Sequence, residues 1–135
     1  IMLKKIITLI LLLLVVGALV AISRNNRIAN EIFTPKEITL GVKEKGSVAD
    51  FSITFNEFIQ DSRCPIDVQC IQAGAVNINV TMQVGAKKVT RNFPSDEVPQ
   101  QFEGYKISIV DVLPKRMSKK EINPNDYKIT FQIEQ

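Results

Sequence analysis

Histidine is absent from this 135-residue chain, and Cys64 and Cys70 are its two cysteines. Without histidine there is no imidazole to act as a general base near neutral pH, and no Ser–His or Cys–His pair for nucleophilic catalysis. A zinc site needs four ligands, which two cysteines without histidine do not supply. We therefore predict a protein that is not an enzyme and has no catalytic residue, no bound metal and no cofactor.

The two cysteines lie in the segment DSRCPIDVQCIQAG, which holds the densest group of special residues in the chain. Their C-x₅-C spacing differs from the C-x-x-C turn of thioredoxin-type redox sites. In an exported protein, two cysteines this close form a structural disulfide. Closing such a ring is worth about 2.4 kcal/mol in the loop-entropy account. We predict a Cys64–Cys70 disulfide.

Four neighbouring residues are expected to order this loop: Asp61, Arg63, Pro65 and Gly74. The Asp61 carboxylate is predicted to cap loop backbone groups, and Arg63 to donate to chain carbonyls or to Asp67. Gly74 lets the chain approach its neighbour closely as it re-enters the sheet.

The ring formed by the disulfide loses little entropy when a partner orders it further, so it is a candidate contact surface. That surface would comprise Ile66, Asp67, Val68 and Gln69. In the alternative arrangement, Ile66 or Val68 plugs the end of the domain. A second candidate surface, expected to be flexible, is the polar segment Lys115–Asn125.

Alternating apolar residues follow Pro35 and predict β-strands. The apolar side chains between 105 and 112 are expected to divide between faces, with Tyr105, Ile107 and Ile109 on one and Val110 and Val112 on the other. Because each strand has one apolar face, the fold class is all-β, an antiparallel sandwich of six to seven strands. The predicted strands cover residues 38–42, 51–55, 76–84, 87–93, 105–112 and 127–134.

The disulfide loop also carries a resemblance. The string DSRCP, four residues, Cys, two residues and Ala-Gly resembles a family of uncharacterised small exported bacterial β-proteins. The later strands that begin at Gly104-Tyr105 and Asp126-Tyr127 match the same family. The resemblance covers the chain from about Lys36 onward and implies an exported β-sandwich, with no activity attached.

An uncharged apolar run, Ile6–Ile22, precedes this domain, with basic residues on both sides of it. We predict a membrane anchor or signal-anchor helix over 1–23, with a signal peptide cleaved after Ala18 as the alternative. Residues 24–35 form a stalk or linker, helical in part, and 36–135 the extracytoplasmic sandwich. The formal net charge of +3 arises before residue 36, so the domain has no excess charge for nucleic acid.

These features predict a non-enzymatic module at the cell envelope. It would serve as a structural or interaction domain, attached to the membrane by its N-terminal helix, with an unknown protein partner or with other copies of itself. One alternative is a pilin-like filament subunit with the helix in the filament core, although Lys5 stands where bacterial pilins typically carry Glu. Another is a periplasmic ligand-binding or inhibitor domain.

Overall fold

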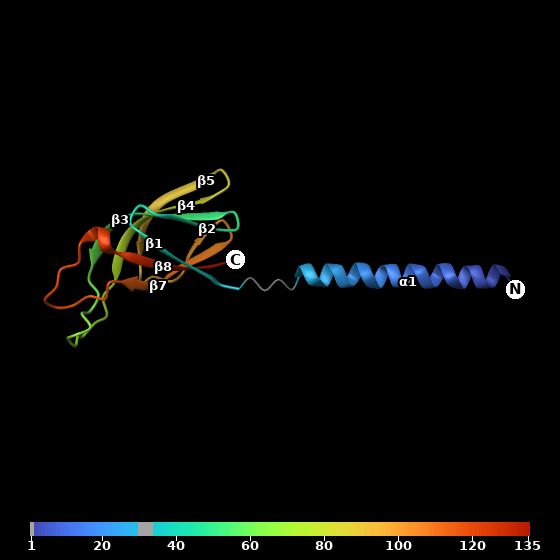
Figure 1. Ribbon diagram of the computed structural model, residues 1–135, viewed down its shortest axis with the longest axis horizontal. Helices are drawn as coiled ribbons and strands as arrows, with labels where there is room; N and C mark the ends of the chain where they lie inside the picture. Colours follow the sequence, from blue (N-terminus) through green and yellow to red (C-terminus); the bar gives the residue numbers. More distant parts are fainter. Residues whose placement is uncertain (1, 30–33) are drawn as a thin grey trace. The chain divides into compact units, whose positions relative to one another are not determined.

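A computed structural model describes residues 2–29 and 34–135. The chain divides into two compact units, Ile1–Phe33 and Thr34–Gln135, each described here by itself. The first unit holds one helix, α1 (Met2–Ala29), and the second holds all of the strands (Figure 1).

Helix α1 continues beyond the apolar run and includes the first residues of the predicted stalk. Residues 30–33 of that stalk lie outside the described residues. Among the residues described, no helix has both the length and the hydrophobicity that a membrane span requires. The transmembrane part of the prediction for 1–23 is therefore not supported. The uncharged run Ile6–Ile22 falls short of the roughly 20 apolar residues of a typical span.

Two antiparallel sheets of four strands each form the second unit. One sheet has the order β1-β8-β7-β6, with β1 (Lys36–Gly41), β8 (Lys128–Glu134), β7 (Tyr105–Leu113) and β6 (Gln100–Phe102). The other has the order β2-β3-β4-β5, with β2 (Lys45–Val48), β3 (Phe51–Asp61), β4 (Val76–Val84) and β5 (Lys87–Pro94). A short 3₁₀ helix, η1 (Pro124–Asp126), precedes β8. The predicted all-β antiparallel sandwich is confirmed.

The described residues contain eight strands, where six to seven were predicted. The alternation of apolar residues predicted no strand at β2 or β6. Both strands lie at the edge of a sheet, and both are short. Edge strands are commonly short and polar, so they carry little of the alternation that identifies a strand from sequence.

Alternate side chains of the central strands fill the space between the sheets. Most of the apolar residues identified by period in these strands are fully buried in the structure, whereas Ile109 is half-buried. From β3 and β4 the buried residues are Phe51, Ile53, Phe55, Val76, Ile78, Val80 and Met82; from β7 and β8 they include Ile107, Ile129, Phe131 and Ile133.

One predicted face is wrong, in β7. Val112 is buried and Val110 is 44% exposed, although both were expected on the face opposite Tyr105. The ladder between β7 and β8 shifts register between Ile109 and Asp111. Such a bulge adds one residue and returns the following side chains to the first face. Val112 therefore joins Tyr105 and Ile107 in the core.

Two loops meet at one end of the sandwich, which we call the loop end. The disulfide loop, 62–75, joins β3 to β4, and the basic loop, 114–127, joins β7 to β8. Lys128 at the start of β8 pairs with Gly41, whereas Ile133 near its end pairs with Lys36. The chain therefore enters β1 at the end of the ladder remote from the basic loop (Figure 1).

Candidate functional site

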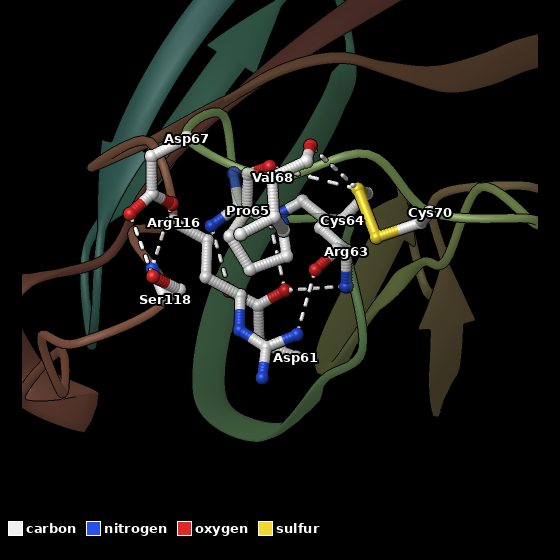
Figure 2. The surroundings of a disulfide bond; sticks show 9 residues. All are labelled: Asp61, Arg63, Cys64, Pro65, Asp67, Val68, Cys70, Arg116 and Ser118. Carbon is white, nitrogen blue, oxygen red and sulfur yellow. Dashed lines mark hydrogen bonds and ion pairs between the residues drawn. A yellow bond between two sulfur atoms is a disulfide. The ribbon is translucent and has the colours of Figure 1, made fainter.

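The two cysteines are joined at the loop end. Cys64 and Cys70 form a disulfide with their Cα atoms 5.9 Å apart, which confirms the prediction (Figure 2). The bond closes the outer part of the disulfide loop into a small ring.

Arg63 lies at the base of this ring and joins the two sheets. Its Nε and Nη2 donate to the two carboxylate oxygens of Asp61 at 2.9 and 2.7 Å. Its Nη1 donates to the carbonyl of Val112 and its Nη2 to that of Pro114, both at 2.9 Å. The guanidinium therefore fixes the end of β3 to the end of β7. Both side chains are largely shielded, that of Arg63 being 16% exposed and that of Asp61 6%.

Tyr127, just before β8, completes the buried part of the site. Its hydroxyl donates to Asp61 Oδ2 at 2.9 Å, and its ring stacks on Phe58 with centroids 4.2 Å apart. The Arg63 guanidinium carbon lies 6.0 Å from the centre of the same ring. This position over an aromatic face favours a cation.

The electrostatics of this cluster follow from its burial and its hydrogen bonds. Burial disfavours the Asp61 carboxylate, but hydrogen bonds from Arg63 and Tyr127 outweigh it and hold the pKa of Asp61 below its usual value. Burial of the Tyr127 hydroxyl, together with its bond to Asp61, raises the pKa of Tyr127 to about 12. At neutral pH the cluster therefore holds an ion pair and a neutral phenol.

Besides the bond from Arg63 to Pro114, four hydrogen bonds tie the two loops together. The Arg116 side chain donates to the Arg63 carbonyl at 2.6 Å, and the Ile66 amide donates to the Arg116 carbonyl at 2.9 Å. Asp67 accepts from the backbone and hydroxyl of Ser118 at 2.8 and 2.6 Å (Figure 2). Those bonds lower the pKa of the Asp67 carboxyl. Asp67 is therefore bonded to Ser118 and not to Arg63. Of the two predicted kinds of partner, Arg63 donates to chain carbonyls.

Gly74 allows the close approach expected of it. A Cβ at this position would lie 1.7 Å from the Ser62 carbonyl oxygen. The neighbouring Ala75 exchanges backbone and hydroxyl hydrogen bonds with Ser62 at 2.8–3.0 Å. Pro65 is half-buried and its carbonyl accepts from the Val68 amide at 3.3 Å, which closes a turn inside the ring.

The outer surface of the disulfide loop is exposed and apolar. Ile66 is 68% exposed and Val68 47%, so the alternative in which they plug the domain is wrong. Asp67 and Gln69 are also exposed. We define the apolar loop surface as the exposed large apolar residues of both loops with the last residue of β7: Ile66, Val68, Ile71, Leu113 and Met117.

A groove of about 750 Å³ opens beside this surface. We call it the basic groove, because Arg116, Lys119 and Lys120 line it. The other lining residues are Phe58, Asp61, Met117, Ser118, Glu121, Ile122, Pro124 and Tyr127. The segment 115–125, the second candidate surface, forms one side of this groove and is bonded to the disulfide loop through Arg116 and Ser118.

Sequence reasoning missed Phe58 and Tyr127 as parts of the site, although Tyr127 was placed at the start of the last predicted strand. Arg116 and Ser118 lay within the second candidate surface, 115–125, with no role assigned to either residue. Within residues 2–29 and 34–135, no group of three potential metal-binding side chains occurs. The basic side chains of the site can form charge-assisted hydrogen bonds, and its exposed apolar side chains can make apolar contacts. The carboxylate at its centre, that of Asp61, is already paired with Arg63.

No protein-family model, curated protein or solved structure matches this chain. The resemblance to small exported bacterial β-proteins stays a prediction based on the disulfide-loop pattern.

Proposed function

We propose that this chain is an exported, non-enzymatic β-sandwich that binds a partner through its loop end. The observation that carries the proposal is the apolar loop surface, two of whose residues, Ile66 and Val68, lie within the disulfide ring. Isolated exposed apolar residues are ordinary on protein surfaces, but a group of them on adjoining loops is typical of an interaction site.

The bonding beneath this surface supports binding. Arg63 bonds the disulfide loop to the end of β7, and the disulfide closes its outer part. Arg116 and Ser118 bond the same loop to the basic loop. A surface that is already ordered loses little conformational entropy when a partner binds, so more of the contact energy contributes to affinity. Loops on a rigid sheet framework are also where binding residues concentrate.

The proposed location is the cell envelope, outside the cytoplasm. Disulfides persist in oxidising compartments, and the Cys64–Cys70 bond fits such a compartment. The hydrophobic run Ile6–Ile22 after Lys4 and Lys5 has the order of an export signal, either retained as a membrane tether or cleaved. Protease added to intact spheroplasts should then digest the sandwich. Survival of the sandwich until the membrane is broken would contradict this location.

Site-specific photo-crosslinking in intact cells tests the binding surface. A photoreactive residue at Ile71, which is fully exposed, should give a crosslinked adduct. The matched control is Lys88, also exposed, on the edge strand β5 at the remote end of the sandwich. Adducts at Lys88 alone, or at neither position, would contradict the proposal.

Charge substitution provides the corresponding loss of function. Ile66→Asp and Val68→Asp should abolish the Ile71 adduct and leave the thermal midpoint nearly unchanged, because both side chains are already exposed. A lowered midpoint with normal crosslinking per folded molecule would show that these residues serve stability instead.

A second candidate function is a subunit of a filament. It is favoured by α1, whose described large apolar side chains are exposed, including Leu11, Leu12, Leu13 and Leu14. Exposed apolar side chains on a helix are unfavourable in water, and contact with other copies of the same helix would bury them. A photoreactive residue at Leu12 would then give adducts between copies of this chain, and the Ile71 position would give none.

A further inference from the structure

The basic groove carries more positive than negative charge that is free to act on a ligand. Arg116, Lys119 and Lys120 line it, and none of the three has an ion-pair partner among the residues that the structure describes. Of the two lining acids, Asp61 is neutralised by Arg63, which leaves Glu121. The groove therefore favours an anionic ligand.

The same groove has apolar walls. Phe58, Met117, Ile122 and Pro124 lie along it, and Phe58 is fixed by its stacking on Tyr127. A ligand that carries an apolar group beside its negative charges would contact both kinds of side chain. The groove is open to solvent, and its volume of about 750 Å³ leaves room for part of a ligand of many atoms.

We propose that the basic groove binds an acidic peptide segment of a partner protein, whose carboxylates pair with Lys119, Lys120 and Arg116. An apolar side chain of the segment lies against Met117 and Ile122. This inference rests on the proposed function, because it specifies the chemistry of the partner at the loop end.

The concave shape favours a peptide over an anionic membrane surface. The side chain of Ile122 is half-buried, as is that of Phe58, and both face the groove as lining residues. A flat lipid surface reaches exposed tips such as Ile71 but not the walls of a groove, whereas a peptide side chain can enter it. Anionic lipid is therefore the competing outcome of the test.

The test uses the full chain in non-ionic detergent and a fluorescein-labelled peptide composed of Glu, Ser and Phe. A matched peptide carries Gln in place of every Glu. By fluorescence anisotropy at low salt, the Glu peptide should bind at least about tenfold more tightly than the Gln peptide, and added salt should reduce the difference. The double variant Lys119→Gln/Lys120→Gln should weaken binding of the Glu peptide about fivefold, because each exposed ion pair contributes modestly.

The control variant is Lys88→Gln/Lys106→Gln, which removes the same charge from exposed lysines at the other end of the sandwich. It should bind the Glu peptide as the native chain does. Equal weakening by both double variants, or equal binding of both peptides, would overturn the proposal. Lys120→Glu provides a second variant at an exposed position and should weaken binding further.

Vesicles containing phosphatidylglycerol test the competing surface. One outcome is that the vesicles bind the chain, that Lys119→Gln/Lys120→Gln weakens this binding, and that the Glu peptide does not bind. The groove is then a lipid site and the peptide proposal is wrong. An Ile71 adduct in cells without peptide binding would refute the groove proposal alone. Peptide binding without the Ile71 adduct would refute the proposed function and retain the groove as a site.

Discussion

Replacing Arg63 by Met should lower the free energy of unfolding by about 3 kcal/mol at pH 7. The native side chain donates four hydrogen bonds, two to Asp61 and one each to the carbonyls of Val112 and Pro114. Met keeps an apolar side chain of similar length but leaves the shielded Asp61 carboxylate without its counter-ion, bonded only to the Tyr127 hydroxyl and the backbone amide of residue 63. Removing one member of a buried pair costs about 3–5 kcal/mol, and the partial exposure of Arg63 favours the lower limit.

The loss should depend on pH in a defined direction. The pKa of Asp61 is lower in the folded chain than in the unfolded chain, so the ion pair contributes fully above about pH 5. Its contribution falls as the pH drops below about 4 and through the folded-state value. The difference between the native chain and Arg63→Met should therefore be smaller at pH 3 than at pH 7.

Urea unfolding followed by far-ultraviolet circular dichroism, with the disulfide intact, measures both effects. In a double-mutant cycle with Asp61→Asn, the two substitutions should couple by about 2 kcal/mol. Additivity within about 0.5 kcal/mol, or a cost for Arg63→Met below about 1 kcal/mol, would refute the assignment of Arg63 as the bond between the sheets. A loss that does not change between pH 7 and pH 3 would refute the role given to the Asp61 charge.

Three further outcomes are expected. Gly74→Ala should destabilise the domain by about 3 kcal/mol or prevent folding, because its Cβ would overlap the Ser62 carbonyl; unchanged urea unfolding would contradict the close approach. Replacing Cys64 and Cys70 by Ser should cost about 2–3 kcal/mol without loss of strand content, as circular dichroism can verify, and two free thiols in the native chain would exclude the bond. Because the pKa of Tyr127 is raised to about 12, stability should be complete below pH 10 and decline between about pH 10 and 12; Tyr127→Phe should reduce that decline in alkaline unfolding curves.

The alternation of apolar residues was sufficient to predict the sandwich, because the long central strands bury one face each. The prediction from alternation failed where a bulge interrupts a strand and where a strand is short and polar. The extra residue near Asp111 reverses the alternation in β7, and no side-chain pattern marks it. Strands β2 and β6 were missed because an edge strand with a polar sequence looks like a turn.

The candidate site was predictable only where its members are close in sequence. The disulfide follows from cysteine spacing, and Asp61 and Arg63 were identified within the same short motif, although their pairing with each other was not predicted. The carbonyls of Val112 and Pro114 were beyond prediction, because every residue carries a carbonyl and only the fold brings these two to Arg63. Ser118 is equally remote from Asp67 along the chain, so their pairing depends on the meeting of two loops that no periodicity connects.

The antiparallel pairing of β1 with β8 determines how the domain would carry mechanical load. If a tether pulls on Lys36 and a partner holds the loop end beyond Lys128, the force acts at opposite ends of a ladder of six residue pairs. Ladder hydrogen bonds lie perpendicular to the strands. Tension along the strands therefore loads all six pairs in shear at the same time. Force applied between Lys36 and the end of β8 would instead open the pairs one at a time. Binding through the loop end therefore places the domain in its mechanically stronger direction.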